Sequence, residues 1–385
     1  MSKRDPENKE KYVIIGGGAA GLNCAETLRQ SNFTGEILII SNENSVPYDR
    51  TLLSKALPQG DSSKFVLRPA DFLKEYDIDI TFRRTVEKVD TKDKRIYLKD
   101  GAELNYDKLC IATGSTARTL GAFKVPGHDL KGVEVLRSAK DQTAIKELAA
   151  KSKSVVIIGA SFIGSEAAAS VKSFYKDKVD VHLVDIAKVP FERVLGKEVG
   201  LMVKSMHEDA GVKMHTEAQL ARLEGNEDGH VTKVVLKDGT VIEADLVIQG
   251  LGVTPNTQFL KDEVELDRWG GVICDPFLQT TAKDVYAAGD ICSFPNWQTG
   301  DRMRIEHWTV ALDQGTFAAF NMMNKLVPYG EIPFFWTRMY NKSIQYVGNA
   351  MFFDEVHIQG DVKEKKFIAF YIKDGRVLAV SGMDQ

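Results

Sequence analysis

Two segments of the chain each combine a β-branched run, a glycine-rich turn and a helix-forming stretch. The first turn reads Gly16-Gly-Gly-Ala-Ala-Gly21 after Lys-Tyr-Val-Ile-Ile, and the second reads Gly159-Ala-Ser-Phe-Ile-Gly164 after Ser-Val-Val-Ile-Ile. A strand, a tight turn and a helix in this order direct backbone N–H groups and the positive end of the helix dipole at a pyrophosphate. The sequence therefore predicts two dinucleotide sites, and with them an exchange of electrons between two dinucleotides.

An acidic residue at the end of the following strand supports both sites. Glu43 lies 27 positions after Gly16, and Asp185 lies 26 positions after Gly159. Such an acid can bind ribose hydroxyls, and at Asp185 it favours a free 2′-hydroxyl over a 2′-phosphate, which predicts NADH rather than NADPH. Glycine-rich turns also serve strand–helix packing alone, but packing does not require the acid twice at nearly equal spacing. Ser161 stands where a middle glycine is usual.

The elements that position these turns repeat one plan. Each nucleotide unit is followed by a β-rich insertion with an Asp-Gly turn, at Asp100-Gly101 and at Asp238-Gly239, which is typical of a hairpin. A strand ending in small residues then returns at 109–114 and at 246–252. A strand at 284–290, a helix around 308–325, and strands near 343–349 and 367–381 follow. The pattern predicts an α/β fold with two Rossmann-type domains, each with an inserted β-meander, plus a small α+β C-terminal domain.

The composition agrees with a multi-domain enzyme. The chain has 385 residues, a formal net charge of −4, a pI of about 6.0 and a mean hydropathy of −0.20. No apolar run approaches the roughly 18 residues that span a bilayer, and no basic bias points to nucleic acid. The first ten residues mix both charge signs and resemble neither a secretory leader nor a transit peptide. We therefore expect a flexible tail at 1–10 and a cytoplasmic protein.

The cysteines predict no metal or disulfide chemistry. Cys24, Cys110, Cys274 and Cys292 are isolated in sequence, without a Cys-x-x-Cys or a Cys/His spacing suited to zinc or an iron–sulfur cluster. Flavin enzymes that reduce disulfides need a nearby thiol pair, and the sequence offers none. Cys24 and Cys110 are expected to be buried as small hydrophobic residues.

Further blocks resemble a known family over about residues 11–383. They are Pro47-Tyr-Asp-Arg50, Leu53-Ser-Lys55, Ala112-Thr-Gly114, Tyr286-Ala-Ala-Gly-Asp290, Glu306-His307-Trp308 and the stretch from Pro333 to Gly348. The chain resembles flavoprotein pyridine-nucleotide oxidoreductases of the ferredoxin-reductase and apoptosis-inducing-factor group, above all the apoptosis-inducing factor 3-like branch. The resemblance implies glutathione-reductase-like domains. It predicts a discontinuous FAD-binding domain at 11–128 and 252–328, an NAD-binding domain at 129–251 and a C-terminal domain at 329–385.

The resemblance implies that the first turn holds FAD. The implied FAD contacts are Gly16, Gly18, Ala19, Ala20, Gly21, Glu43, Arg50, Lys55, Val86, Ala112, Thr113, Gly114, Arg118, Asp290, Glu306, His307, Trp308 and Trp336. A carboxylate such as Asp290 can accept hydrogen bonds from ribityl hydroxyls, although an aspartate after glycine is also common in plain turns. The two tryptophans could border the flavin ring or serve the core. His307 could donate to the ring or be a core histidine, and no acid–base role is assigned to it.

The implied NAD contacts follow the second turn. They are Gly159, Ser161, Phe162, Ile163, Gly164, Glu166, Asp185 and Gly252. Lys55 and Glu166 are the predicted catalytic residues, because family members place these positions face to face beside the flavin. A cation there stabilises the electron-rich reduced ring, and the glutamate keeps the lysine charged and aimed. Without the resemblance, Lys55 reads equally well as a surface lysine and Glu166 as a helix N-terminal acid that never meet.

Two functions remain open at this stage. The first is a flavoprotein oxidoreductase that transfers a hydride from NADH to FAD and passes electrons to a ferredoxin, a Rieske protein or a quinone. The second is a slow NADH-responsive redox sensor of the apoptosis-inducing-factor type, which signals through a charge-transfer complex and dimerisation. The chain lacks Rieske ligands, so we expect a separate acceptor unless the chain is a fragment. A fragment could also belong to mitochondria, and either a monomer or a homodimer is expected.

Overall fold

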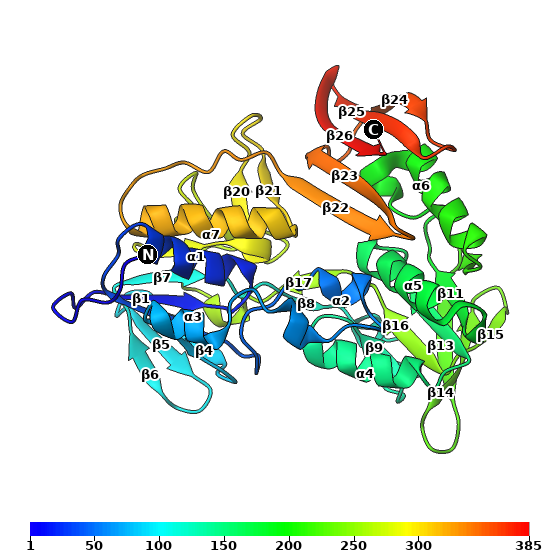
Figure 1. The fold of residues 1–385 in the computed structure, drawn as a ribbon, viewed down its shortest axis with the longest axis horizontal. Coiled ribbons are helices and arrows are strands. Elements are labelled where there is room, and N and C mark those ends of the chain that lie inside the picture. Colours follow the sequence, from blue (N-terminus) through cyan, green and yellow to red (C-terminus); the bar gives the residue numbers. More distant parts are fainter. Residues whose placement is uncertain (385) are drawn as a thin grey trace. The chain divides into compact units, whose positions relative to one another are not determined.

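The computed structural model describes residues 1–384 (Figure 1). Contacts divide the chain into two compact units, each described by itself below. The first unit comprises Met1–Asp49, Phe65–Thr116 and Thr254–Pro333; the second comprises Arg50–Lys64, Ala117–Val253 and the chain from Phe334 onward. The C-terminal segment thus groups with the segment predicted to bind NAD. The three-domain division expected from the sequence stays a prediction.

The first unit is built on a parallel five-stranded sheet. Its strands, in spatial order, are β19 (Val285–Ala287), β7 (Lys108–Ile111), β1 (Lys11–Ile15), β2 (Glu36–Ile40) and β3 (Ile78–Thr81). Continuous apolar runs form these strands because both faces of a parallel sheet are covered. The chain leaves β1 toward β2 on one side, and β7 pairs with β1 on the other. The carboxyl end of β1 is therefore a topological switch point, where open α/β sheets bind ligands.

Two helices lie side by side in this unit (Figure 1): α1 (Ala19–Gln30) and α7 (Trp308–Met322). Their close approach depends on Gly315, where an added Cβ would lie 2.3 Å from the carbonyl oxygen of Ala20. The helix expected around 308–325 is confirmed. A third helix, α3 (Ala70–Glu75), precedes β3.

Smaller sheets complete the first unit. The antiparallel meander consists of β4 (Val86–Asp90), β5 (Arg95–Leu98) and β6 (Glu103–Asn105). A second three-stranded sheet contains β18 (Val272–Ile273), β20 (Cys292–Pro295) and β21 (Arg302–Arg304). A two-stranded sheet of β8 (Ser115–Ala117) and β17 (Val253–Pro255) lies where the chain passes from one unit to the other and back.

The second unit repeats the plan. Its parallel sheet has the order β12 (Lys213–His215), β11 (Asp180–Val184), β10 (Ser154–Ile158), β16 (Leu246–Gln249) and β9 (Val133–Val135). The predicted meander is present as β13 (Leu220–Gly225), β14 (Val231–Leu236) and β15 (Val241–Glu243). The helices are α2 (Leu52–Lys55), α4 (Ala139–Ala149), α5 (Phe162–Tyr175) and α6 (Glu192–Asp209). A Ser138–Asp141 capping box starts α4.

The C-terminal part is an antiparallel sheet that belongs to the second unit. Its order is β22 (Phe334–Met339), β23 (Lys342–Gly348), β26 (Arg376–Met383), β25 (Lys366–Lys373) and β24 (Glu355–Asp361). Asp374 and Gly375 both have positive φ and form the tight turn between β25 and β26. Residues 334–384 contain no helix of their own. The helical component expected there is supplied by α6, which lies next to the sheet (Figure 1). Leu195 and Val199 of α6 share a core cluster with Tyr371.

Short 3-10 turns connect several of these elements. The 3-10 turns are Ser62–Phe65, Leu120–Phe123, Lys176–Lys178, Gln258–Leu260 and Gly289–Ile291. Near the N-terminus, Ser2 N–H donates to the Arg29 carbonyl at 2.9 Å and Arg4 pairs with Glu36 at 3.0 Å. None of the helices within residues 1–384 has both the length and the apolar character that crossing a bilayer requires.

Candidate functional site

The predicted residues of the first unit gather at one edge of its parallel sheet. Gly16 directly follows β1, Ala112 follows β7, and Asp290 lies in the turn after β19. Glu43 follows β2 by three residues. Because these four strands are parallel neighbours, their carboxyl ends lie along the same edge. The fold therefore brings together residues that are up to 274 positions apart in the chain (290 − 16).

The glycines of the first turn have separate tasks. Gly16 has φ +120°, and a Cβ there would lie 2.1 Å from the Ala112 carbonyl oxygen; a Cβ at Gly21 would lie 2.0 Å from the carbonyl oxygen of Gly16. These two positions bring strand, turn and helix close together. Gly18, the N-cap of α1, has no atom within 4 Å of an added Cβ, and no side chain caps the helix there. This open helix N-terminus fits the pyrophosphate of FAD.

Two carboxylates flank that turn. Asp290 Oδ2 accepts a hydrogen bond from Ser115 Oγ at 2.6 Å, and Arg304 Nη1 donates to the Asp290 carbonyl at 2.8 Å. Glu43 Oε2 accepts from the Tyr48 hydroxyl at 2.7 Å. Both acids are thus held in place by neighbours. Their oxygen acceptors suit the ribityl and ribose hydroxyls of a dinucleotide.

The block at 306–308 leads into α7. His307 is the N-cap residue of this helix. Burial lowers the pKa of His307 to about 4, so the imidazole is neutral near pH 7. Trp308 is half-buried against the core of the first unit, and Glu306 pairs with Arg304 at 2.7 Å.

The second unit reproduces the geometry of the first turn. Gly159 has φ +102° and a Cβ there would lie 2.3 Å from the Gly250 carbonyl oxygen; at Gly164 the Cβ would lie 1.9 Å from the Gly159 carbonyl oxygen. The difference is Ser161, which caps α5 by accepting the Gly164 N–H at 3.3 Å. Gly252 has φ +81° and open space around a Cβ. The turn fits a second pyrophosphate, with one N–H already satisfied by a hydroxyl.

Asp185 directly follows β11 and binds the second turn. Its Oδ2 accepts the Ala160 N–H at 2.5 Å, and its Oδ1 accepts the Ala187 N–H at 2.6 Å. The carboxylate is therefore fixed beside the glycine-rich turn, at the position where an acid contacts the adenosine ribose of a bound dinucleotide.

Lys55 and Glu166 meet in the second unit. Lys55 Nζ lies 2.9 Å from Glu166 Oε1, and the glutamate is 4% exposed. Lys55 Nζ also donates to the Thr51 carbonyl at 3.3 Å and lies 5.9 Å from the centre of the Trp336 ring. Lys55 and Glu166, which the sequence alone did not bring together, thus form an ion pair. The Trp336 ring lies next to this pair.

Four of the residues predicted to contact FAD belong to the second unit: Arg50, Lys55, Arg118 and Trp336. Arg50 Nη1 donates to the Arg137 carbonyl at 2.6 Å, and the Arg118 N–H donates to the Gly252 carbonyl at 2.9 Å. Val86 begins β4, in the meander of the first unit. The remaining predicted FAD residues also lie in the first unit, and the predicted NAD residues lie in the second.

Sequence reasoning missed several polar partners of the site. Ser54 and Thr337 donate to Glu166, Ser115 donates to Asp290, and Tyr48 donates to Glu43. Single hydroxyl residues of this kind form no motif. Ser54 lies inside the block Leu53-Ser-Lys55, which was the one available signal for it.

The four cysteines are free and buried, as expected for Cys24 and Cys110. Although they are isolated in sequence, the fold brings Cys24 next to Cys110 and Cys274 next to Cys292. A hydrogen bond with Cys110, together with burial, raises the pKa of the Cys24 thiol, and burial raises that of Cys292 beside Cys274. All four cysteines lie in the core of the first unit.

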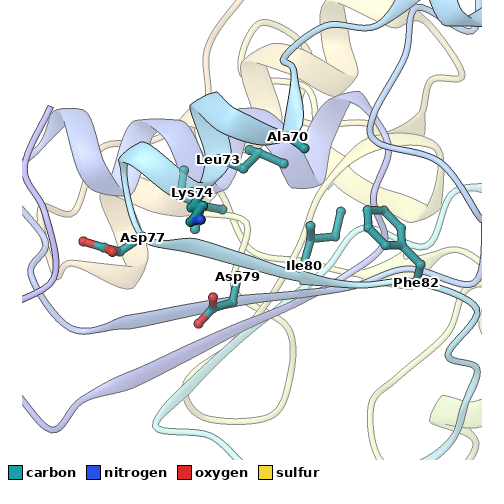
Figure 2. A pocket seen from close by; sticks show the side chains of 8 residues that line it. Ala70, Leu73, Lys74, Asp77, Asp79, Ile80 and Phe82 are labelled. Carbon is teal, nitrogen blue, oxygen red and sulfur yellow. The ribbon is translucent and has the colours of Figure 1, made fainter.

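One cavity of about 210 Å³ lies between α3 and β3 in the first unit (Figure 2). Its lining consists of Ala70, Leu73, Lys74, Asp77, Ile78, Asp79, Ile80 and Phe82. None of these residues belongs to the predicted site. Within residues 1–384, no cluster of three or more His, Cys, Asp or Glu side chains could hold a metal ion.

With this geometry in place, the chain can be compared with known proteins. Residues 10–315 match the family described as pyridine nucleotide-disulphide oxidoreductase, and residues 334–385 match the reductase C-terminal family. The chain therefore belongs to the pyridine nucleotide-disulphide oxidoreductase family. Its fold of two nucleotide-binding segments and a small antiparallel C-terminal sheet is that of the ferredoxin reductases to which it is similar.

Particular relatives and structures refine the comparison. The chain is 38% identical to human apoptosis-inducing factor 3 over 375 residues, covering 97% of this chain and 60% of that protein. It is 34% identical to a probable ferredoxin reductase of Castellaniella defragrans, covering 97% of this chain and 90% of that protein. The solved ferredoxin reductase for the CYP199A2 system of Rhodopseudomonas palustris matches with a TM-score of 0.92 and 31% identity over 98% of this chain and 91% of that chain. The putidaredoxin reductase–putidaredoxin complex matches with a TM-score of 0.91 and 29% identity over 98% and 90%.

Proposed function

We propose that the protein is a flavoprotein reductase that takes electrons from NADH and delivers them to a small electron-carrier protein. The observation that carries the proposal is the duplicated strand–turn–helix cradle in one chain, with Glu43 held near the first turn and Asp185 bound to the second. Ferredoxin reductases of similar length support the delivery to a carrier. One solved relative is held covalently to putidaredoxin. FAD, when bound, would accept a hydride from NADH and give two electrons one at a time to the carrier.

The chain's own residues would bind and orient the two cofactors. The N-terminus of α1 at Gly18 would hold the FAD pyrophosphate, with Glu43 and Asp290 accepting hydroxyl donors. The N-terminus of α5 at Ser161 would hold the NADH pyrophosphate. Asp185 would bind the adenosine ribose and would thereby favour NADH over NADPH.

We propose that Lys55 stabilises the charge of the reduced flavin. Its ammonium, held by Glu166, would sit beside the flavin as the family resemblance implies and would stabilise the negative charge that reduction places there. Trp336, 5.9 Å from the ammonium, would exclude water on the same side. The neutral His307 would take no part in proton transfer.

Anaerobic titration of the FAD-loaded protein with NADH tests the proposal. Rapid bleaching of the flavin band in a stopped-flow instrument, with turnover on ferricyanide and on a ferredoxin, is the expected result. Sluggish reduction with a persistent long-wavelength charge-transfer band would favour the redox-sensor alternative, and a protein that stays colourless with added FAD would overturn both. A parallel titration with NADPH should need a much higher nucleotide concentration. The cytoplasmic location and the monomeric or dimeric state stay predictions.

A further inference from the structure

We infer that Ser54 and Thr337 are positioning residues that fix the Glu166 carboxylate and, through it, the ammonium of Lys55. The inference rests on the proposed function, because it assigns these hydroxyls a task in flavin reduction. Neither residue lies in a nucleotide fingerprint. All four side chains belong to the second unit.

Three donors converge on the one carboxylate. Glu166 Oε1 accepts from Lys55 Nζ at 2.9 Å and from Thr337 Oγ1 at 2.7 Å. Glu166 Oε2 accepts from Ser54 Oγ at 2.5 Å. The hydroxyl residues are as deeply buried as the acid, since Ser54 is 5% and Thr337 is 1% exposed. Water therefore has little access to replace them.

The hydroxyls set the orientation of the carboxylate. The last torsion of a glutamate side chain is broad and has no sharp preferred angle. Lys55 contacts Oε1 alone, which leaves the carboxylate plane free to rotate about that contact. Donors on both oxygens fix the plane, and hydrogen bonds to an ionised group are the strong ones. The direction from which Lys55 is held then follows from Ser54 and Thr337.

The donors come from segments that are far apart in the chain. Ser54 and Lys55 lie on α2, Glu166 on the first turns of α5, and Thr337 on β22. The C-terminal sheet thus contributes a hydroxyl to a carboxylate on the NAD-fingerprint helix. The residue before Thr337 is Trp336, whose ring faces the same ammonium at 5.9 Å. Lys55 is held between an anion and an aromatic ring, and β22 supplies a part of each contact.

A merely structural role would also explain two buried hydroxyls, so the test must separate the two roles. The variants are Thr337→Val, which keeps the shape and removes the hydroxyl, Thr337→Ser, which keeps the hydroxyl, and Ser54→Ala. Ser381→Ala is the matched control: this hydroxyl is also 1% exposed in the same sheet, but it bonds Tyr371 at 2.7 Å. Stopped-flow reduction of the FAD-loaded proteins by NADH gives the limiting rate and the nucleotide Kd separately.

We expect Thr337→Val and Ser54→Ala to slow the limiting rate about 5-fold to 30-fold, with the Kd for NADH within about 2-fold of wild type. Thr337→Ser should restore most of the rate, and Ser381→Ala should keep it while lowering Tm. In a Lys55→Met background, Thr337→Val should cause no further loss, because the hydroxyl acts through the lysine.

Wild-type rates in Thr337→Val and Ser54→Ala would overturn this inference but not the proposed function. An equal further loss in the Lys55→Met background would also overturn it, since the hydroxyl would then act without the lysine. If Thr337→Val fails to bind FAD, Ser54→Ala carries the comparison by itself, because it removes the donor to Oε2. A wild-type protein that binds FAD but is not reduced by NADH would overturn the proposed function and this inference together.

Discussion

The carboxylate of Asp185 has two tasks in the second nucleotide turn. It holds the turn by accepting the N–H groups of Ala160 and Ala187. In the proposed NADH complex its negative charge would also face the ribose 2′ substituent. The first task concerns binding of any pyridine nucleotide, whereas the second concerns the choice between NADH and NADPH. A substitution that removes the charge and keeps the shape separates them.

We predict that Asp185→Asn raises the ratio of kcat/KM for NADPH to that for NADH by about 10-fold or more, which corresponds to about 1.4 kcal/mol. The absolute kcat/KM for NADH should fall, because an amide accepts only one of the two backbone bonds. Steady-state kinetics with ferricyanide measure both values. The control is Asp180→Asn at the exposed start of β11, where Asp180 pairs with Lys213 at 3.2 Å. An unchanged ratio in Asp185→Asn would contradict the assignment.

At the scale of the element, one strand–turn–helix serves both binding and packing. Gly16 and Gly21 let the helix approach the strand, while Gly18 leaves room at the helix N-terminus. In the second copy Ser161 occupies the position of Gly18 and already carries a Cβ. The first copy can therefore accept a Cβ at this position without a clash inside the protein. A Cβ there would narrow the space that we propose for the pyrophosphate of FAD.

We predict that the Gly18→Ala protein folds normally and binds FAD about 10-fold or more weakly. This change corresponds to a loss of about 1.4 kcal/mol of binding free energy. Gly16→Ala should fail to fold stably, since φ is +120° and the new Cβ would lie 2.1 Å from the Ala112 carbonyl oxygen. Circular dichroism measures folding, and FAD fluorescence measures FAD binding. Gly330→Ala, whose Cβ meets ordinary contacts of 3.7 Å, is the control in the same unit. Normal FAD affinity in Gly18→Ala would place the pyrophosphate elsewhere.

The same elements show which features the sequence could predict. The two turns, the meanders and the Asp374-Gly375 hairpin follow from local chemistry: glycine at positive φ, β-branched runs and turn residues. The contact between Lys55 and Glu166 joins residues 111 positions apart (166 − 55), and only the family resemblance suggested it. Thr337 lies farther still from Glu166, and no local pattern marks a hydroxyl that faces a distant acid.

Over the whole molecule, the grouping of the C-terminal sheet is another feature that local patterns could not supply. The alternation of apolar and polar residues along β22–β26 predicts strands, but it does not predict which surface covers them. The covering helix is α6, and its core contacts with Phe335 and Tyr346 connect segments about 140 residues apart. A helix deep in the second nucleotide segment thus completes the core of the C-terminal part.

His207 of α6 is fully buried and makes the unfolding of the second unit sensitive to pH. Its Nδ1 lies 2.8 Å from the Tyr340 hydroxyl, and burial lowers its pKa to about 4. In the unfolded chain the pKa is about 6.5. Below pH 6.5 the unfolded chain therefore binds a proton that the folded protein does not, so stability falls as the pH falls from about 6.5 to about 4.

We predict that His207 alone lowers the free energy of unfolding of the FAD-loaded protein by about 2 kcal/mol when the pH falls from 7.5 to 5.0. His182, whose pKa burial also lowers to about 4, adds to the loss, whereas burial raises the pKa of the Glu134 carboxyl and opposes it. Urea unfolding of His207→Asn, which keeps a polar atom near Tyr340, should show a smaller difference between the two pH values than wild type. His357→Asn on exposed β24 should keep the wild-type difference. Equal losses of unfolding free energy in wild type and His207→Asn would exclude His207 as the titrating group. The expected difference in pH dependence between the two proteins comes only from protonation of His207 in the unfolded chain.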